Sequence, residues 1–212
     1  MSHCQCQGIE SIFDDKSAEK SLKQYQKKGP SKTTGLLIDV IQKQEPKARN
    51  LLDIGGGIGA IHFALLEAGI QQATLVEASK ASAHVAREET NRRGFGERVS
   101  FEQGDFTEIS DSISECDIVT LDRVICCYDN MQELVSKSSK KARKLYGVVY
   151  PRDIWLTRTM VPLLNLFSKL RGNSFRVFVH PVAEVDSIIR SSGLSPIFAR
   201  EFIFWQVVVY SK

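Results

Sequence analysis

The fold of this chain is decided by the stretch Leu51-Leu52-Asp53-Ile54-Gly55-Gly56-Gly57-Ile58-Gly59-Ala60. A short apolar run enters a turn that carries glycine at three alternating positions, and a helical pattern leaves the turn. Glycine is needed where the backbone takes up a positive φ or where a ligand approaches the main chain closely. A strand, turn and helix of this kind predict a nucleotide-type ligand at the carboxyl end of the strand.

The acidic Asp53 helps to distinguish between the nucleotide-type ligands that could bind at this turn. Dinucleotide sites present backbone N–H groups and a helix N-terminus to a pyrophosphate, and a carboxylate inside that turn would repel phosphate. Asp53 suits a ligand with a positive charge and an amine, such as S-adenosylmethionine. A nicotinamide dinucleotide site stays open as an alternative, because Gly55-x-Gly57-x-x-Ala60 satisfies that fingerprint and Glu77 stands where a ribose-binding acid would.

Length and composition are those of a globular protein with one domain. The chain has 212 residues, of which 42% are apolar and 25% charged, enough for one α/β domain with a full core. The net charge of +3 is too small to argue for nucleic acid. No apolar run approaches the roughly 18–20 residues of a membrane span. The amino-terminal residues lack the pattern of a secretory signal, so we expect a cytoplasmic protein, and five cysteines argue against a disulfide framework.

Strand and helix patterns alternate through most of the chain. We expect a flexible arm over 1–9, helices within 10–45, and an alternating core over 50–150 that predicts a doubly wound, mostly parallel sheet. A segment over 151–180 follows, and a closing helix and antiparallel hairpin lie within 182–210. The expected strands are 50–54, 73–77, 99–103, 117–121, 146–150, 194–199 and 202–210, with a further short one at 175–179. The expected helices are 12–26, one that follows Ser31, 58–68, 81–93, 131–143, 154–170 with a kink or break at Pro162, and 182–191.

Acidic residues end four consecutive strands of the predicted sheet. Asp53 ends the first strand, and Glu77 ends the second, where a carboxylate can accept two hydrogen bonds from a ribose diol. Asp105 follows the third strand, where it can accept from an adenine amino group, and Phe106 offers a ring face or a backbone N–H to the base. Asp122 ends the fourth strand. Because the carboxyl ends of parallel strands share one rim, these residues predict a site for an adenosine ligand.

This pattern resembles the class I S-adenosylmethionine-dependent methyltransferases over about residues 31–210. Asp53 to Gly59 is similar to that family's first motif, and Glu77, Asp105-Phe106 and Leu121-Asp122-Arg123 are similar to the later ones. The stretches Thr120 to Tyr128 and Tyr146 to Arg152 look like the magnesium-protoporphyrin O-methyltransferase branch. The resemblance implies a Rossmann-like seven-stranded sheet with an antiparallel last strand, S-adenosylmethionine as cofactor, and an acceptor site in 151–180. It implies cofactor binding by Asp53, Gly55, Gly57, Gly59, Glu77, Ala78, Asp105, Phe106 and Asp122.

We expect a small, apolar or aromatic acceptor, without nucleic acid, because the chain has no basic stripe. Candidates near the methyl group are Tyr128, Arg123, which can instead pair with Asp122, and His180, which can instead be structural. The side chains expected to wall the acceptor pocket, or to pack in the core, are Trp155, Leu156, Met160, Leu163, Leu164 and Phe167. Tyr25 and Lys32 are expected to cover the cofactor.

The amino-terminal arm leaves one more alternative open. His3, Cys4 and Cys6 have side chains that suit zinc or copper, although only three such groups stand close together and we predict no metal site. A non-catalytic protein that binds a cofactor or a metal is therefore the alternative from a different class.

Overall fold

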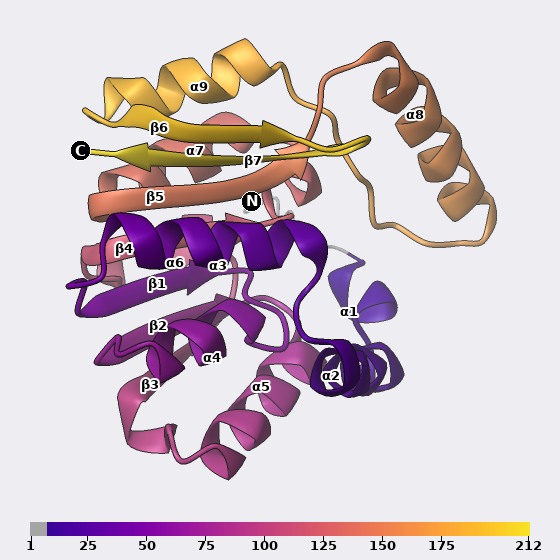
Figure 1. Ribbon diagram of the computed structural model, residues 1–212. Helices are drawn as coiled ribbons and strands as arrows, with labels where there is room; N and C mark the ends of the chain where they lie inside the picture. The colour runs from indigo at the N-terminus through magenta and orange to yellow at the C-terminus, as the bar shows by residue number, and fades with distance from the viewer. Residues whose placement is uncertain (1–7) are drawn as a thin grey trace.

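Seven strands form one sheet in the order β3-β2-β1-β4-β5-β7-β6 in the computed structural model, which describes residues 8–212 (Figure 1). The strands are β1 (Asn50–Ile54), β2 (Gln72–Glu77), β3 (Val99–Gln103), β4 (Cys116–Asp122), β5 (Ala142–Pro151), β6 (Ser195–Glu201) and β7 (Trp205–Ser211). β1 to β5 pair in parallel, and β7 runs antiparallel to both β5 and β6. The predicted doubly wound sheet with an antiparallel last strand is confirmed, and β7 lies inside the edge strand β6.

Helices cover both faces of this sheet. They are α1 (Ile9–Ile12), α2 (Asp15–Lys28), α3 (Lys32–Gln44), α4 (Ala60–Glu67), α5 (Lys80–Arg92), α6 (Phe106–Ile109), α7 (Met131–Lys140), α8 (Trp155–Leu170) and α9 (Val182–Ser191), with single turns at Gly96–Arg98, Ser110–Ser112 and Ile125–Cys127. Side chains alternate across a strand, so Leu51 joins the apolar core beneath α3 and α4 while Leu52 joins the core beneath α7 and α9. Both faces of the central strands are therefore buried, as in other parallel sheets.

Two helix predictions are wrong in detail. The helix predicted over 12–26 is divided into α1 and α2, because Asp14 accepts a hydrogen bond from the backbone N–H of Ser17 at 2.9 Å and starts a new helix there. α1 begins at Ile9, the last residue of the predicted arm, and this side chain is buried. The break that was predicted as one possibility at Pro162 is not present, because α8 runs through this residue, which lies on the exposed side of the helix, where water can donate to the carbonyl group left without an N–H partner.

The segment 175–179, predicted as a short strand, is irregular. Side-chain amides take the place of a neighbouring strand: the backbone N–H of Val177 donates to Asn165 Oδ1 at 2.9 Å, and Asn165 Nδ2 donates to the Val177 carbonyl at 2.7 Å. Asn173 accepts from the backbone N–H of Phe175 at 2.8 Å. Buried backbone N–H and C=O groups need hydrogen-bond partners, but side chains can supply these partners as well as a neighbouring strand can. The apolar pattern at 175–179 therefore did not require a strand.

The carboxyl ends of β1 to β5 meet at one edge of the sheet. In Figure 1, α1 and α2 lie beyond this edge on the side of α5, and α8 stands apart at the opposite end of the same edge. The chain thus brings its amino-terminal helices and the segment after β5 to the strand ends, where ligands bind in folds of this type. No helix among residues 8–212 is long and apolar enough to cross a membrane.

Candidate functional site

A cleft of about 730 Å³ lies at the carboxyl ends of the strands. One part of its wall is polar and is formed by the glycine turn, the ends of β2 and β4, and α2 and α3. The other part is mostly apolar and is formed by the segment after β5 and the β6–β7 hairpin. The predicted site residues that line it are Gly55, Gly57, Glu77, Ala78, Phe106, Asp122, Arg123 and Tyr128. Asp53, Gly59, Asp105 and His180 are not part of this wall.

The glycine turn leaves open space over one of its members. Gly55, Gly57 and Gly59 all have a positive φ, of 61°, 57° and 96°. A Cβ at Gly55 would stand 2.5 Å from Val124 Cγ2 and one at Gly59 would stand 2.2 Å from His62 Cε1, whereas nothing lies within 4 Å of a Cβ at Gly57. The backbone of Gly57 is therefore the place where a ligand can approach the turn.

Asp53 lies beneath the turn and not in the cleft wall. Its side chain is fully buried, and its Oδ1 accepts a hydrogen bond from Thr120 Oγ1 at 2.7 Å, a contact that follows from the register of β1 and β4. Burial raises the pKa of Asp53 to about 7. A Cβ at Gly56 would stand 2.5 Å from Asp53 Oδ2, so the turn folds directly over this carboxyl group.

His62 of α4 is the buried neighbour of this carboxyl group, with 4.0 Å between His62 Nδ1 and Asp53 Oδ2. Thr90 Oγ1 donates its only proton to the Ala86 carbonyl at 2.7 Å, so its 3.2 Å contact with His62 Nε2 requires the proton to be on Nε2. Nδ1 then faces Asp53 as an acceptor. Burial lowers the pKa of His62 to about 3, so the imidazole is neutral at ordinary pH. Neither Asp53 Oδ2 nor His62 Nδ1 has a hydrogen-bond partner among the described residues.

Glu77 connects the end of β2 to the glycine turn. Its Oε2 accepts from the backbone N–H of Gly57 and its Oε1 from the backbone N–H of Ser79, both at 2.8 Å. Burial raises the pKa of this carboxyl group, against these hydrogen bonds. A carboxylate has about four acceptor positions, so these two bonds leave Glu77 further positions for a ligand hydroxyl.

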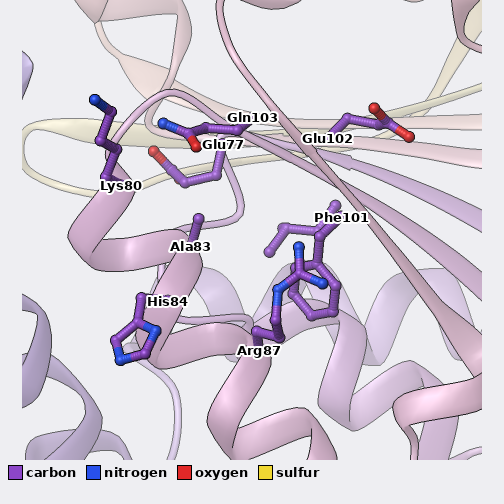
Figure 2. A pocket seen from close by; sticks show the side chains of 9 residues that line it. Glu77, Lys80, Ala83, His84, Arg87, Phe101, Glu102 and Gln103 are labelled. Carbon is purple, nitrogen blue, oxygen red and sulfur yellow. The ribbon is translucent and has the colours of Figure 1, made fainter.

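Glu77 also lines a second, smaller cavity of about 190 Å³ between α5 and β3. Figure 2 shows its side chain beside Gln103 and on the same side as Lys80, while the guanidinium of Arg87 lies over the ring of Phe101 at 4.5 Å. The carboxylate thus stands where the two cavities approach each other.

Asp105 holds the loop after β3 in place. Its Oδ1 accepts from the backbone N–H of Thr107 at 2.9 Å, from Thr107 Oγ1 at 2.8 Å and from the hydroxyl of Tyr128 at 2.8 Å. Asp105, Phe106 and Tyr128 are all buried, and of the three only Phe106 and Tyr128 contribute to the cleft wall. From the sequence we expected Asp105 to contact the adenine and Tyr128 to lie near the methyl group, in two separate parts of the site. In the structure a hydrogen bond joins the two side chains.

Asp122 and Arg123 form an ion pair at the end of β4. Arg123 Nε donates to Asp122 Oδ1 at 3.0 Å, and Thr34 Oγ1 donates to Asp122 Oδ2 at 2.5 Å. The guanidinium also donates to Ser31 Oγ at 3.2 Å and to Thr34 Oγ1 at 3.0 Å. Of the two interpretations of Arg123, the structure shows the salt bridge. Arg123 has a φ of 61°, unusual for a residue with a side chain, and its backbone N–H donates to the carbonyl of Val149.

His180 lies outside the cleft wall. Its Nε2 contacts the carbonyl oxygen of Tyr128 at 2.8 Å, which identifies Nε2 as the donor, and burial lowers its pKa. The imidazole is therefore a neutral link between the segment before α9 and the loop after β4. The thiols of Cys126 and Cys127, in the same loop, are free and line the cleft, and both donate to the Arg123 carbonyl.

The apolar wall contains part of the set that the sequence predicted. Met160 and Leu164 line the cleft, whereas Trp155, Leu163 and Phe167 project from α8 into solvent. Tyr25 lines the cleft as predicted, and Lys32 does not. The apolar residues of the wall that the sequence did not single out include Val161, Phe175, Val177, Phe204 and Trp205.

Several polar partners of the site were not predicted. Ser31 was expected only to precede a helix, and Thr34, Ser79, Thr120 and His62 were not singled out as parts of the site. Ser79 and Thr120 had a usable signal, since each lies in or next to a predicted strand end. Among residues 8–212 no three His, Cys, Asp or Glu side chains cluster as metal ligands would, and His3, Cys4 and Cys6, which the sequence left open as metal-binding groups, lie outside the described residues.

Comparisons with known proteins identify both the domain and the fold. A family model described as a methyltransferase domain matches residues 45–178, more than half of the 212 residues. The magnesium protoporphyrin IX methyltransferase of Synechocystis PCC 6803, solved with bound SAH, has a similar structure, with a TM-score of 0.73 and 14% identity over 96% of this chain and 98% of that one. No curated protein sequence matches the chain.

Two further structures share the fold and belong to longer chains. An O-methyltransferase family protein from Burkholderia thailandensis has a TM-score of 0.72 and 15% identity over 98% of this chain and 63% of that one. An O-methyltransferase family 2 protein from Planctomyces limnophilus, in complex with apigenin, has a TM-score of 0.67 and 17% identity over 94% of this chain and 62% of that one. At these identities the likeness supports the fold alone.

Proposed function

Because the chain belongs to the methyltransferase domain family, we propose that it transfers a methyl group from S-adenosylmethionine to a small apolar or aromatic acceptor. The main observation in support of this proposal is that one continuous cleft has both a polar part and an apolar part. Its polar part contains the open backbone of Gly57 and the carboxylate of Glu77, and its apolar part contains side chains such as Met160, Leu164 and Phe204. One cavity thus offers complementary surfaces for a charged nucleoside and for an apolar molecule.

The polar part fits the cofactor on the observed geometry. Gly57 leaves room for close approach, Glu77 keeps acceptor positions for a ribose diol, and Ala78 and Phe106 stand beside it in the cleft wall. Asp122 also lines the cleft, where its charge is paired with that of Arg123. In this proposal Gly55, Gly59, Asp53 and Asp105 act by shaping the turn and the loop after β3.

When bound, the cofactor supplies an electrophilic methyl group for in-line displacement. The chain then has to align the acceptor and exclude water, and an effective molarity gained by alignment supplies much of the acceleration. The wall formed by Met160, Leu164, Phe175 and Trp205 suits both tasks, because it presents apolar surface to the acceptor.

None of the three predicted catalytic side chains points to proton transfer. Tyr128 donates to Asp105, Arg123 pairs with Asp122, and His180 is a neutral donor to a backbone carbonyl. We therefore propose that Tyr128 and Arg123 shape the acceptor side of the cleft, that His180 positions the loop of Tyr128, and that the acceptor reacts in its ionised form or without a general base.

Ligand-dependent thermal stability tests the cofactor assignment. A ligand that binds only the native state adds about 2.7 kcal/mol at 100 times its dissociation constant. We expect this shift with S-adenosylhomocysteine and S-adenosylmethionine and none with NADH or NADPH. A shift with the nicotinamides alone would establish the oxidoreductase alternative.

A matched pair of variants tests the site itself. Glu77→Gln should weaken S-adenosylhomocysteine binding at least tenfold by titration calorimetry, since an amide replaces one carboxylate acceptor by a donor. Glu102→Gln makes the same change on an exposed side chain of β3 and should leave the affinity unchanged. Equal affinity of both variants would exclude Glu77 from the cofactor site.

A further inference from the structure

The outward face of α8 is an apolar surface that nothing in the described chain covers. Trp155, Leu163 and Leu170 are 75%, 66% and 76% exposed, and Leu166 and Phe167 are more than half exposed. Leu163, Leu166, Phe167 and Leu170 follow the spacing of one helix face. Of the sixteen residues of α8, only Thr157 and Val161 are buried. Figure 1 shows the helix standing apart from the layers of the sheet.

This surface is continuous with the mouth of the cleft. Leu164, on the neighbouring side of α8, lines the cleft and is still 54% exposed. Phe204, at the tip of the β6–β7 hairpin, also lines the cleft, and the adjacent Ile203 is 71% exposed. Arg152, just before α8, holds this tip through hydrogen bonds to the carbonyls of Phe202 and Phe204.

The segment that contains α8 carries a net positive charge. Between residues 151 and 180 there are five arginine and lysine residues and one aspartate, a net charge of +4. Arg158 and Lys169 are eleven positions apart, about three helical turns, so they lie on the same side of α8, beside the apolar face; Arg158 is paired with Asp153. Lys169 and Arg171 are exposed at the carboxyl end of α8.

We propose that α8 docks on the surface of an anionic phospholipid bilayer, with its apolar face in the headgroup region and its basic residues against the lipid phosphates. An interfacial helix has this combination of exposed tryptophan, leucine and phenylalanine with flanking lysine and arginine. The cleft mouth then opens toward the bilayer, so an apolar acceptor can enter from the lipid. This last step rests on the proposed function, whereas the docking does not.

Charge and length favour this occupant over the alternatives. A two-fold dimer through α8 would bring the same patch of each copy together, and so place the positively charged segment of one copy against that of the other. The sixteen residues of α8 span about 24 Å, less than the roughly 30 Å of a bilayer core, so the helix is suited to lie on the surface and not to cross it.

Vesicle binding of the full chain tests the docking. Trp205→Phe leaves Trp155 as the only tryptophan, so its emission reports on α8 directly. With vesicles of phosphatidylcholine and phosphatidylserine, we expect a blue shift and co-sedimentation. Affinity should be at least tenfold lower for phosphatidylcholine alone and should fall with added salt. Absence of binding to the anionic vesicles would overturn the proposal.

Variants separate the two components of the surface. Leu163→Gln combined with Leu166→Gln should lower vesicle affinity at least tenfold. Lys169→Gln should lower it about fivefold on anionic vesicles only. Ile197→Gln changes an apolar residue of β6 that is 43% exposed and outside the surface, and should have no effect. Circular dichroism and melting temperature confirm that each variant is folded, and equal binding by all of them would contradict the proposal.

Two further measurements give independent outcomes. Sedimentation velocity without lipid should show a monomer, and a dimer that Leu163→Gln with Leu166→Gln dissociates would mean that a second copy covers α8 instead. S-adenosylhomocysteine binding and co-sedimentation with the same vesicles are both measured on the wild-type chain. Vesicle binding without cofactor binding would sustain the docking and refute the proposed function, and the reverse result would do the opposite.

Discussion

The buried pair of Asp53 and His62 leads to a specific prediction for the pH dependence of folding. The pKa of Asp53 is raised by burial from 3.8 to about 7, so in the range between these values the native carboxyl keeps a proton that the unfolded one loses. The pKa of His62 is lowered by burial from 6.5 to about 3, so the unfolded imidazole takes up a proton that the native one does not. The two effects have opposite signs.

Between pH 3.8 and 6.5 the native pair holds one proton on Asp53 and the unfolded pair holds one on His62. Because the proton counts are equal, the pair adds no slope to the free energy of unfolding in this range. If one member is replaced by a group that does not titrate, the native and unfolded states differ by one bound proton. The free energy of unfolding then changes by about 1.4 kcal/mol per pH unit. From pH 4 to pH 6 the accumulated change is about 2.8 kcal/mol.

The sign depends on which member is removed. In His62→Gln the remaining group is Asp53, which keeps its proton in the native state and loses it in the unfolded state. The free energy of unfolding relative to the wild type should therefore fall as the pH rises. In Asp53→Asn the unfolded state binds the extra proton, so relative stability should rise with pH. Urea unfolding of the wild type, both single variants and the double variant at several pH values measures these slopes, and all other titrating groups cancel in the differences. Slopes of the same sign in the two single variants would refute the reasoning.

Four further substitutions give simpler tests. Tyr128→Phe removes the bond to the carboxylate after β3 and should cost about 1.5–3 kcal/mol in urea unfolding. Gly57→Ala puts a methyl group into the open cleft at a φ of 57° and should both destabilise the fold and weaken S-adenosylhomocysteine binding in calorimetry. Gly69→Ala, at a φ of 112° with equally open space, should lower only the melting temperature. Gly147→Val would meet an α3 side chain within 2.7 Å and should lower the melting temperature without changing the sheet.

The sheet could be predicted because its signals are local. The apolar run before Gly55 and the alternation of strand and helix patterns fix the order of the elements, and β1 and β3 have the predicted bounds. The break at Asp14 and the irregular segment at 175–179 were missed for a different reason. In both segments, a side chain that accepts a hydrogen bond from a backbone N–H decides the local structure. The spacing of apolar residues does not predict such hydrogen bonds.

From the sequence we could predict which strand ends form the site, but not how their side chains are oriented. The parallel arrangement brings the acids to one edge, as expected, but their orientation depends on residues far away in the sequence. Asp122 is held by Thr34, 88 positions earlier, and Asp105 by Tyr128, 23 positions later. No spacing rule connects such pairs, so the sequence could not distinguish an acid that faces the ligand from one that holds a loop.

The four strand-end acids differ in how much hydrogen-bonding capacity remains for a ligand. Asp53 is beneath the turn, and Asp105 lies outside the cleft wall and uses Oδ1 for three donors from its own loop and the next. Both oxygens of Asp122 accept from Thr34 or Arg123. Glu77 lines the cleft and accepts one backbone N–H on each oxygen, which fixes the carboxylate and leaves each oxygen another acceptor position. Three of the acids therefore make the rim rigid in advance, and Glu77 is the one whose substitution should affect ligand affinity more than folding.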